Sequence, residues 1–532
     1  MVGYKPFIWP GVLALAITPG LAVVAILYMI WLSFGNLQSF RIDSYLLGVL
    51  EFTLLQATLS TLLSLLFALP VARALARRNN FPGRQALLKL FGLPLVIPVV
   101  VTVFGITAIW GQNGLVSESM QYVGFDGLSP LYGLTGILIA HTFFNMPLMV
   151  RLMLPIWESI PGEYWRIASM TGMNSLAMFR FIELPKLRDG LPGIIILVFL
   201  LCFTSFTIVL ILGGGPQATT IEVAIYHEVR SNFNLPKAIF LALMQVAICL
   251  LVSLLLLKFA LFQPSSSTEN REITRSDTLT TLSKINDTFW ITFGCLWVAA
   301  PIVGIITRGL FGPIVQVLGN QAVWEATFRS LMVGLGSGLI AVTLGLLLSS
   351  TTRDIAVRGK KVGLANRLEL TGSQALIVSP IILGTGLYVI LISWISVFEY
   401  SLYLATIING LIAVPFVLRL VSPILRQNAE NHDALCNSLG LSGLNRIRIV
   451  ELPLIKKEVI LAFALTTAMA TGDLTSVVFF SSGRDPTLAL MLYQALGNYR
   501  VNESAVMALL LIVVCLMVFV IIERLGHVLL RS

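Results

Sequence analysis

The chain has 532 residues, of which 57% are hydrophobic and only 11% charged, and its formal net charge is +9. Soluble domains carry about 25% charged residues, so this chain has too few charges to cover the surfaces of several soluble cores. Its Lys and Arg residues lie mainly between apolar stretches, which favours a membrane topology over nucleic-acid binding.

Apolar stretches long enough to cross a bilayer recur along the whole chain. The first, at 11–34, is longer than the roughly 7–15 residues of a signal-peptide core, so we expect it to remain as the first span. A crossing helix needs about 20 mostly apolar residues, and this rule predicts an all-α polytopic membrane protein. The twelve predicted spans lie at 11–34, 52–72, 88–110, 132–154, 191–212, 238–262, 289–310, 328–350, 373–396, 402–423, 459–480 and 505–523.

The distribution of basic residues predicts the orientation of these spans. Five Lys or Arg residues lie within 73–89, after the second span, whereas the next connection, at 111–131, has none. The same basic enrichment follows the eighth span at 353–367, and also follows the fourth and tenth spans. Because cytoplasmic loops are enriched in Lys and Arg, we expect these loops and both termini to lie in the cytoplasm, with the protein in the cell inner membrane.

A polar, turn-rich segment at 263–287 divides the chain and predicts a flexible linker. On either side, 1–262 and 288–532 each contain six predicted spans, and the two halves share an internal repeat. Residues 146–152, with sequence MPLMVRL, resemble VPFVLRL at 414–420, and ELP occurs at both 183–185 and 451–453. Both pairs have the same spacing along the chain, called here the repeat offset. The sequence therefore predicts two parallel six-helix repeats related by an axis along the membrane normal.

The loop after the fourth span of each half, at about 156–190 and 424–458, is the most informative repeated segment. In the first loop, Pro161 and Glu163 suit the first turn of a short helix, where a carboxylate complements the positive helix end. Gly172 can adopt the left-handed conformation that ends such a helix. Gly440 is the equivalent residue of the second loop and is expected to adopt the same conformation.

A second short helix is expected after this bend. Asn174 can cap its N-terminus, and so can the equivalent Ser442. We expect Pro185 to disfavour helical geometry at Leu184 and so to close the unit. A bent pair of this kind could be an ordinary interfacial hairpin, but its duplication at a fixed offset on the predicted cytoplasmic side favours a functional role.

A Gly followed thirteen residues later by Pro, in both halves, resembles the EAA loop of type I ABC importer permeases. The resemblance covers nearly the whole chain, although Arg166-Ile167-Ala168 and Ala434-Leu435-Cys436 stand where Glu-Ala-Ala is usual. It implies the type I permease fold, with loops that dock in grooves of a cytoplasmic ATPase dimer. The candidate ATPase-coupling residues are Pro161, Glu163, Ala168, Gly172, Glu183, Pro185, Gly440, Glu451 and Pro453.

The chain has no phosphate-binding loop of its own, since Gly359-Lys360-Lys361 lacks the following Ser or Thr. We therefore expect a permease subunit without enzymatic activity and without a cofactor, whose partner ATPase binds ATP and Mg²⁺. The sequence HEVRS at 227–231 lacks the second His of a zinc protease, so no metal or catalytic site is expected. A periplasmic substrate-binding protein and membrane lipid are the other implied partners. The alternative class is a secondary transporter of the major facilitator type, which also has two parallel six-span repeats.

The cargo is suggested by finer resemblance. HTFFNMP at 141–147, LGGGPQATTIE at 212–222, and the motifs at 493–494 and 497–500 look like those of the thiamine permeases. The Gly-rich stretch also resembles ferric-iron permeases, so thiamine (or its phosphates) is favoured and ferric iron remains the alternative. At Gly213-Gly214-Gly215, a flexible outer loop is favoured over a phosphate cradle.

Among the polar residues inside predicted spans, where such groups are costly, Asp473, His141 and Asn145 are singled out. Asp473 is the candidate residue of the translocation path. It either contacts cargo, caps a broken helix or faces a water-filled gate. His141 and Asn145, four residues apart on one helical face, are expected to bond neighbouring helices.

Overall fold

The computed structural model describes residues 9–34, 43–112, 114, 116–117, 131–259, 275–278, 280–373, 378–441, 443–481 and 483–531, and all regular elements within these ranges are helical. Up to the middle of the chain they are α1 (Trp9–Phe34), α2 (Ser44–Arg77), α3 (Arg84–Leu90), η2 (Leu93–Leu95), α4 (Val99–Trp110), α6 (Leu134–Glu158), α7 (Gly162–Met170), α8 (Ser175–Met178), η3 (Phe179–Glu183), α9 (Leu184–Phe203), α10 (Thr207–Leu212), η4 (Pro216–Ala218), α11 (Ile221–Arg230), α12 (Leu235–Phe259) and η5 (Ser276–Thr278).

The remaining elements are α13 (Thr281–Leu310), α14 (Ile314–Leu318), α15 (Gln321–Arg353), η6 (Asp354–Arg358), α16 (Val362–Gly372), α17 (Pro380–Leu391), α18 (Ser401–Ser438), α19 (Gly443–Arg446), η8 (Ile447–Glu451), α20 (Leu452–Thr471), α21 (Thr475–Phe480), α22 (Leu488–Gly497) and α23 (Val501–Arg531). The flexible-linker prediction is wrong for the end of 263–287, because η5 lies within it and α13 already begins at Thr281. Residues 263–274 lie outside the described ranges.

Within the described ranges, eight helices are long and apolar enough to cross a membrane, or nine if one bent pair counts as a single span. The eight are α1, α2, α6, α12, α13, α15, α18 and α23. The polytopic all-α class is therefore confirmed, whereas the number of twelve spans stays a prediction.

Three predicted spans are interrupted. The segment expected at 88–110 bends by 111° between 84–95 and α4, at Pro94 and Pro98. Proline lacks a backbone N–H and clashes with the preceding turn, which accounts for the break. The spans expected at 191–212 and 459–480 are also split, into α9 with α10 and α20 with α21. Periodicity alone cannot reveal such breaks, because both pieces remain apolar.

The two halves use the same helix pairings. In the first, α2 packs on α6 and α9, and in the second, α15 packs on α18 and α20. Glycines permit this close approach: a Cβ on Gly345 would lie 2.5 Å from Cγ1 of Val417, and one on Gly334 would lie 2.9 Å from the Thr467 carbonyl oxygen. Small residues at contacts of this kind are typical of helix packing in membranes.

The first helix of each half packs against the opposite half. Helix α1 packs on α15 and α17, and α13 packs on α2 and α4. A Cβ on Gly386 would lie 2.5 Å from Cβ of Ala25, and one on Gly105 would lie 2.6 Å from the Pro301 carbonyl oxygen. Residues 1–262 and 288–532 are thus interlocked, although they are separate in sequence.

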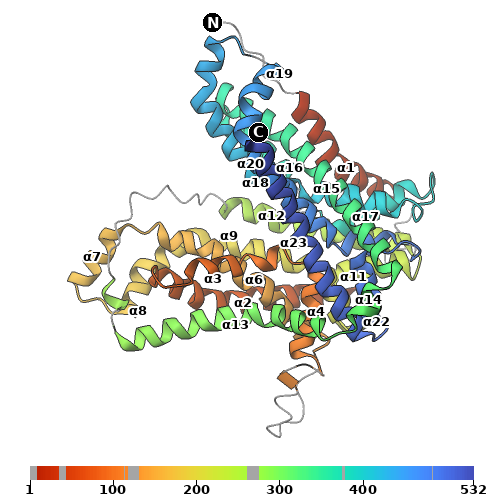
Figure 1. The fold of residues 1–532 in the computed structure, drawn as a ribbon, viewed down its shortest axis with the longest axis horizontal. Helices are drawn as coiled ribbons and strands as arrows, with labels where there is room; N and C mark the ends of the chain where they lie inside the picture. The colour runs from red at the N-terminus through yellow and green to blue at the C-terminus, as the bar shows by residue number, and fades with distance from the viewer. Residues whose placement is uncertain are drawn as a thin grey trace.

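The molecule has two diverging arms (Figure 1). Helices α7 and α8 lie at the end of one arm, α19 lies at the end of the other, and α11, α14 and α22 lie together where the arms meet. Both ends of the described chain belong to the α19 arm, because the Gly11 amide donates to Oγ1 of Thr351 at 2.8 Å and Gly526 packs on Ile460. The two predicted coupling loops therefore lie at the far ends of the arms.

Candidate coupling loops and translocation path

The first loop has the predicted bend. Helix α7 begins at Gly162, directly after Pro161, and carries Glu163 in its first turn. Gly172 has φ +66°, and the next amide, of Met173, donates to the Ala168 carbonyl at 3.0 Å. This hydrogen bond closes the helix C-terminus, and its geometry requires the glycine between its two partners to be left-handed. The left-handed conformation predicted for Gly172 is confirmed.

The second loop has the same bend at the equivalent position. Gly440 has φ +65°, and the Leu441 amide donates to the Cys436 carbonyl at 2.9 Å. Its preceding helix differs from α7, because α18 runs without a break from Ser401 to Ser438. The first loop's helix is hinged to its span at 159–161, whereas the second loop's helix is an extension of its span.

The second part of each loop is a continuous helix, which corrects one prediction. Asn174 caps α8 as expected, its Oδ1 accepting from the Ala177 amide at 2.8 Å, while Ser442 lies outside the described residues. Leu184 is helical, with φ −62° and ψ −42°, so Pro185 does not close the unit. A π-turn, η3, precedes it and its wider ring accommodates the proline. The equivalent π-turn, η8, precedes Pro453.

Both loops expose apolar side chains at equivalent positions. Ile167 is 60% exposed and Leu435 is 57% exposed, while Phe181 and Ile449 are 62% and 60% exposed. The members of each pair are separated by the repeat offset. Exposed apolar side chains that cluster on one surface mark interaction sites. The two loops, at the ends of the two arms (Figure 1), thus present exposed apolar side chains at matching positions.

A buried glutamate holds each loop against its arm. In the first, the Glu183 side chain is fully buried and accepts from Nε of Arg73 at 2.7 Å. Nη2 of Arg73 also donates to the Ser175 carbonyl at 2.7 Å, which ties α2 to the start of α8. Arg275, from the segment between the halves, is the second cation on Glu183. Removing one partner from a buried ion pair costs about 3–5 kcal/mol, so these contacts fix the loop to α2.

The second loop has an equivalent arrangement around Glu451. Nε of Arg446 lies 2.8 Å from Oε1 of Glu451, and Arg353 at the end of α15 is a further partner. Arg73 and Arg353 have similar places in the fold, each near the C-terminal end of a long helix, α2 or α15. Glu183 and Glu451 are therefore anchors within the protein, whereas Glu163, the third predicted loop glutamate, is exposed.

The broken spans meet between the two halves. Oγ1 of Thr207, at the start of α10, lies 3.0 Å from Oγ1 of Thr475, at the start of α21. These two threonines are themselves separated by the repeat offset. The contact therefore marks the point where the equivalent breaks of both repeats meet and close against each other.

Asp473 lies at this same break, where it caps α21. Its Oδ1 accepts from the Thr475 amide at 3.2 Å and its Oδ2 accepts from the Ser476 amide at 2.9 Å. A side-chain carboxylate is a preferred acceptor at a helix N-terminus. Of the roles left open by the sequence, the capping of a broken helix is the one that these bonds support.

The other polar residues inside the first half bond neighbouring helices, as predicted. Nδ1 of His141 lies 2.8 Å from Oγ of Ser60 on α2, and Nδ2 of Asn145 donates to Sγ of Cys202 on α9 at 3.1 Å. The glycines at 213–215 follow the end of α10, with φ +73° at Gly214 and +139° at Gly215. They form a turn near α11, far from either coupling loop (Figure 1).

Comparison with known proteins identifies the family. The chain matches the model of binding-protein-dependent transport system inner membrane components over residues 64–261 and 360–531. It belongs to this family. It also has several helices that are long and apolar enough to cross a membrane, so it is a multi-pass inner-membrane permease.

Relatives of this permease are similar over nearly its whole length. It is 40% identical over 482 residues to the thiamine transport system permease protein ThiP of Brucella suis biovar 1 (strain 1330), which covers 91% of this chain and 88% of the relative. It is 36% identical over 518 residues to ThiP of Escherichia coli (strain K12), covering 97% and 96% of the two chains. ThiP of Haemophilus influenzae is 34% identical over 499 residues, covering 92% and 91%.

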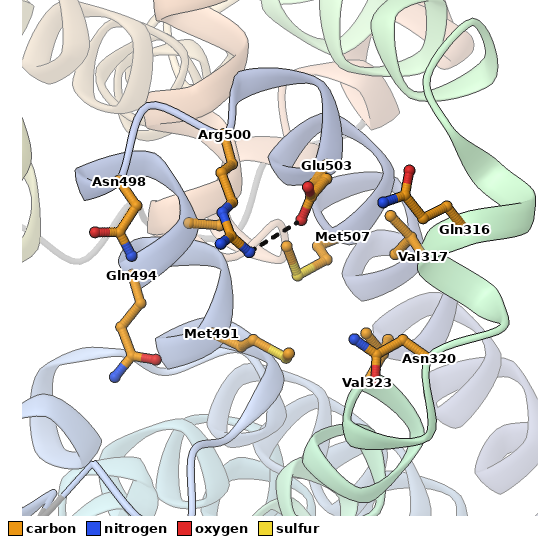
Figure 2. A pocket seen from close by; sticks show the side chains of 11 residues that line it. Gln316, Val317, Asn320, Val323, Met491, Gln494, Asn498, Arg500, Glu503 and Met507 are labelled. Carbon is orange, nitrogen blue, oxygen red and sulfur yellow. Dashed lines mark ion pairs between the residues drawn. The ribbon is translucent and has the colours of Figure 1, made fainter.

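The permease also has a polar pocket of about 260 Å³ at the junction of the arms (Figure 2). One wall comes from Gln316 to Val323 on α14 and α15, and the other comes from α22 and α23. On the second wall, Nη1 of Arg500 lies 3.8 Å from Oε2 of Glu503, three residues further along the chain. Gln494, Asn498 and Arg500, which the sequence marked only as a family-like motif, all line this pocket.

Sequence reasoning missed the cations that hold the loops, and it missed the threonine pair. Arg73 and Arg353 were interpreted only as topology signals, although both follow the end of an apolar span and precede the loops by a similar distance in each half. Thr207 and Thr475 could have been found by searching for polar residues at the repeat offset. Arg275 carries no such signal, because it lies in the segment that the repeat does not include.

Proposed function

We propose that this chain is the membrane-spanning permease subunit of an ATP-driven thiamine importer. The observation that supports this most strongly is the pair of bends at Gly172 and Gly440, which match in φ, in position within the repeat and in the exposed apolar side chains beside them. The cargo follows from the relatives, which are named as thiamine transport permeases over nearly the same length. Ferric iron is the alternative cargo.

The proposed topology is twelve spans in two parallel repeats, 1–262 and 288–532, with both termini in the cytoplasm. The ends of the described chain lie on the arm that carries α19, which supports placing them on the same side as the loops. Cytoplasmic ATPase subunits supply ATP hydrolysis with Mg²⁺, and a periplasmic binding protein delivers cargo. The permease itself needs no catalytic group or cofactor in this scheme.

The mechanism that fits the geometry is alternating access. The arms diverge toward the loop ends and meet near α11 and α22 (Figure 1), and the Thr207–Thr475 contact closes the axis between them. This arrangement supports a path that faces the cytoplasm in this state. When two ATPase subunits close on ATP, they push the loops together, separate the broken spans and open the path to the binding protein. Hydrolysis then restores the inward-facing state.

The loop residues have distinct proposed roles when the ATPase subunits close on ATP. Gly172 and Gly440 fix the bend, Glu183 and Glu451 transmit force to α2 and α15, and the exposed apolar side chains contact the ATPase. Pro161 and Ala168 start and seat α7, while Glu163 stabilises its first turn. Pro185 and Pro453 follow the π-turns that join each loop to its span.

The proposed role of Asp473 is to hold the break between α20 and α21, so that Thr475 stays on the axis. Contact with a cationic cargo is a second proposed role, because Asp473 lies beside the axis and carries the one charge in the predicted span 459–480.

The test is uptake into proteoliposomes that contain the permease with its copurified ATPase and candidate binding proteins. Thiamine accumulation that needs both ATP and the ATPase is the expected result, and omission of the ATPase is the matched control. Ferric-iron uptake would retain the class and overturn the cargo. Uptake without any ATPase would overturn the class in favour of a secondary transporter.

A further inference from the structure

Two charged residues from the segment between the halves are buried inside the first coupling loop. Arg275 and Asp277 have side chains that are 8% and 0% exposed, although the surrounding sequence is polar and rich in turn residues. Burial of an ion pair carries a desolvation cost that a simple tether would not require. This burial indicates that the segment does more than connect the two halves.

Arg275 contacts both parts of the loop. Its guanidinium carbon lies 3.8 Å from the centre of the Trp165 ring on α7, and it pairs with Glu183 on η3. A cation on a desolvated indole face is among the stronger cation–π contacts. Trp165 and Ala168 are the buried residues of α7, so Arg275 covers the face by which this helix is held.

Asp277 joins this contact to α2. It lies 3.1 Å from Nε of Arg275 and 3.5 Å from Nε of Arg77, whose Nη2 also donates to the Asp277 carbonyl at 2.7 Å. Burial by itself would raise the pKa of Asp277, but Arg275 and then Arg77 more than offset this, so its pKa lies below the ordinary value of 3.8. The carboxylate is therefore ionised near neutral pH, and the pair bridges α7 to α2.

The second loop makes the same contacts with its own residues. There Arg446 pairs with Glu451 and with Asp433, and Asp433 lies 2.9 Å from Nε of Arg358. At the repeat offset, the first-loop positions equivalent to Arg446 and Asp433 are Met178 and Trp165. Both are apolar and buried, so the first loop contains neither the cation nor the acid of this cluster.

The first loop also has the greater need for such contacts. Helix α7 is separated from α6 at residues 159–161, whereas the equivalent part of the second loop continues α18. A helix that is covalently continuous with its span transmits a push along its axis. A hinged helix transmits it only through side-chain contacts with the rest of the arm.

We propose that Arg275 and Asp277 are positioning residues of the first coupling loop: the segment between the halves supplies the ion pair that this loop lacks and so makes α7 move with α2. The proposal rests on the proposed function, because it gives the Arg275–Asp277 pair a part in transmitting the movement of the ATPase subunits to the membrane helices. The segment is thus a component of the coupling machinery on one arm only.

The test uses the assembled transporter with Arg275→Gln, and with Lys284→Gln as the matched control, because Lys284 is an exposed cation nearby on α13. A spin label at Arg166→Cys or Ala434→Cys reports loop mobility without any need for cargo, because both residues are exposed, occupy equivalent positions and lie outside the apolar docking side chains. Arg275→Gln should mobilise the label at position 166 and leave the label at position 434 unchanged, while thiamine transported per ATP falls roughly tenfold. Lys284→Gln should change neither label.

Mobilisation of both labels would indicate a general loss of stability and overturn the proposal, as would mobilisation of neither. Arg275→Lys keeps the charge but loses the planar stacking and the fork of donors, and should give an intermediate mobility of the label at position 166 alone. Adding Met178→Arg to Arg275→Gln places a cation where the second loop has Arg446 and should restore both mobility and coupling. If wild type hydrolyses ATP but takes up no thiamine, the cargo assignment fails, and the label comparison still decides the role of the pair.

Discussion

The bends at Gly172 and Gly440 allow a clean test of coupling, because at these positions only the backbone opposes a larger side chain. A Cβ on either glycine would meet nothing within 4 Å. The cost of a substitution therefore comes from the left-handed conformation, at φ +66° and +65°. For an L-residue this is about 1–2 kcal/mol, and β-branching adds to it. A change of that size lowers the population of the bent loop by a factor of about 5–30.

Gly172→Val and Gly440→Val should each reduce thiamine uptake while ATP hydrolysis continues, measured in parallel in proteoliposomes. Gly172→Asn and Gly440→Asn should retain uptake, because Asn tolerates the left-handed region. Gly363→Val is the matched control: this helical glycine also has open space around its Cβ, but its φ is not positive. Full transport by both Val variants would refute the argument that these bends couple hydrolysis to transport.

Three further predictions concern the axis, the docking surfaces and the buried ion pair. Thr207→Cys with Thr475→Cys should form a cross-link that stops uptake until it is reduced, because their side-chain oxygens are 3.0 Å apart; uptake by the cross-linked form would contradict a gate there. Ile167→Asp and Leu435→Asp should each lower copurification of the ATPase about tenfold or more, since burial of such a side chain contributes about 1.5–3 kcal/mol; unchanged copurification would place the docking surface elsewhere. Because the pKa of Asp277 is depressed, its stabilising effect is fully present above the ordinary value of 3.8 and is lost as pH falls through the folded-state pKa. The melting temperatures of wild type and Asp277→Asn should therefore differ by a constant amount between about pH 5 and 8 and converge below pH 3.8; convergence near neutral pH would contradict this.

The features that could be predicted from the sequence are those set by residue type at one position and by the internal repeat. Two glycines separated by the repeat offset, each thirteen residues before a proline, were enough to predict two left-handed bends. The Asn174 cap and the helix-to-helix bonds of His141 and Asn145 followed from residue type and position.

The π-turns, the helix breaks and the contacts of Arg275 could not be predicted from short stretches of sequence. Pro185 was expected to end a helix, but the preceding π-turn removes the clash, and no local pattern announces a π-turn. The breaks that place Thr207 and Thr475 together lie inside apolar stretches, where periodicity continues through them. The contacts of Arg275 depend on how the chain returns from the first half to the second, which is a tertiary feature.

The central claim is that two equivalent loops carry the ATPase stroke to the membrane path. The decisive quantity is the distance between spin labels at Arg166→Cys and Ala434→Cys, two exposed equivalent positions outside the apolar docking side chains, in a chain whose five native cysteines have been replaced. The measurement is made by double electron–electron resonance on the assembled transporter, with and without a non-hydrolysable ATP analogue. We predict that the distance between the two labels becomes shorter when the nucleotide binds, because the two arms close. A distance that does not change on nucleotide binding would contradict it.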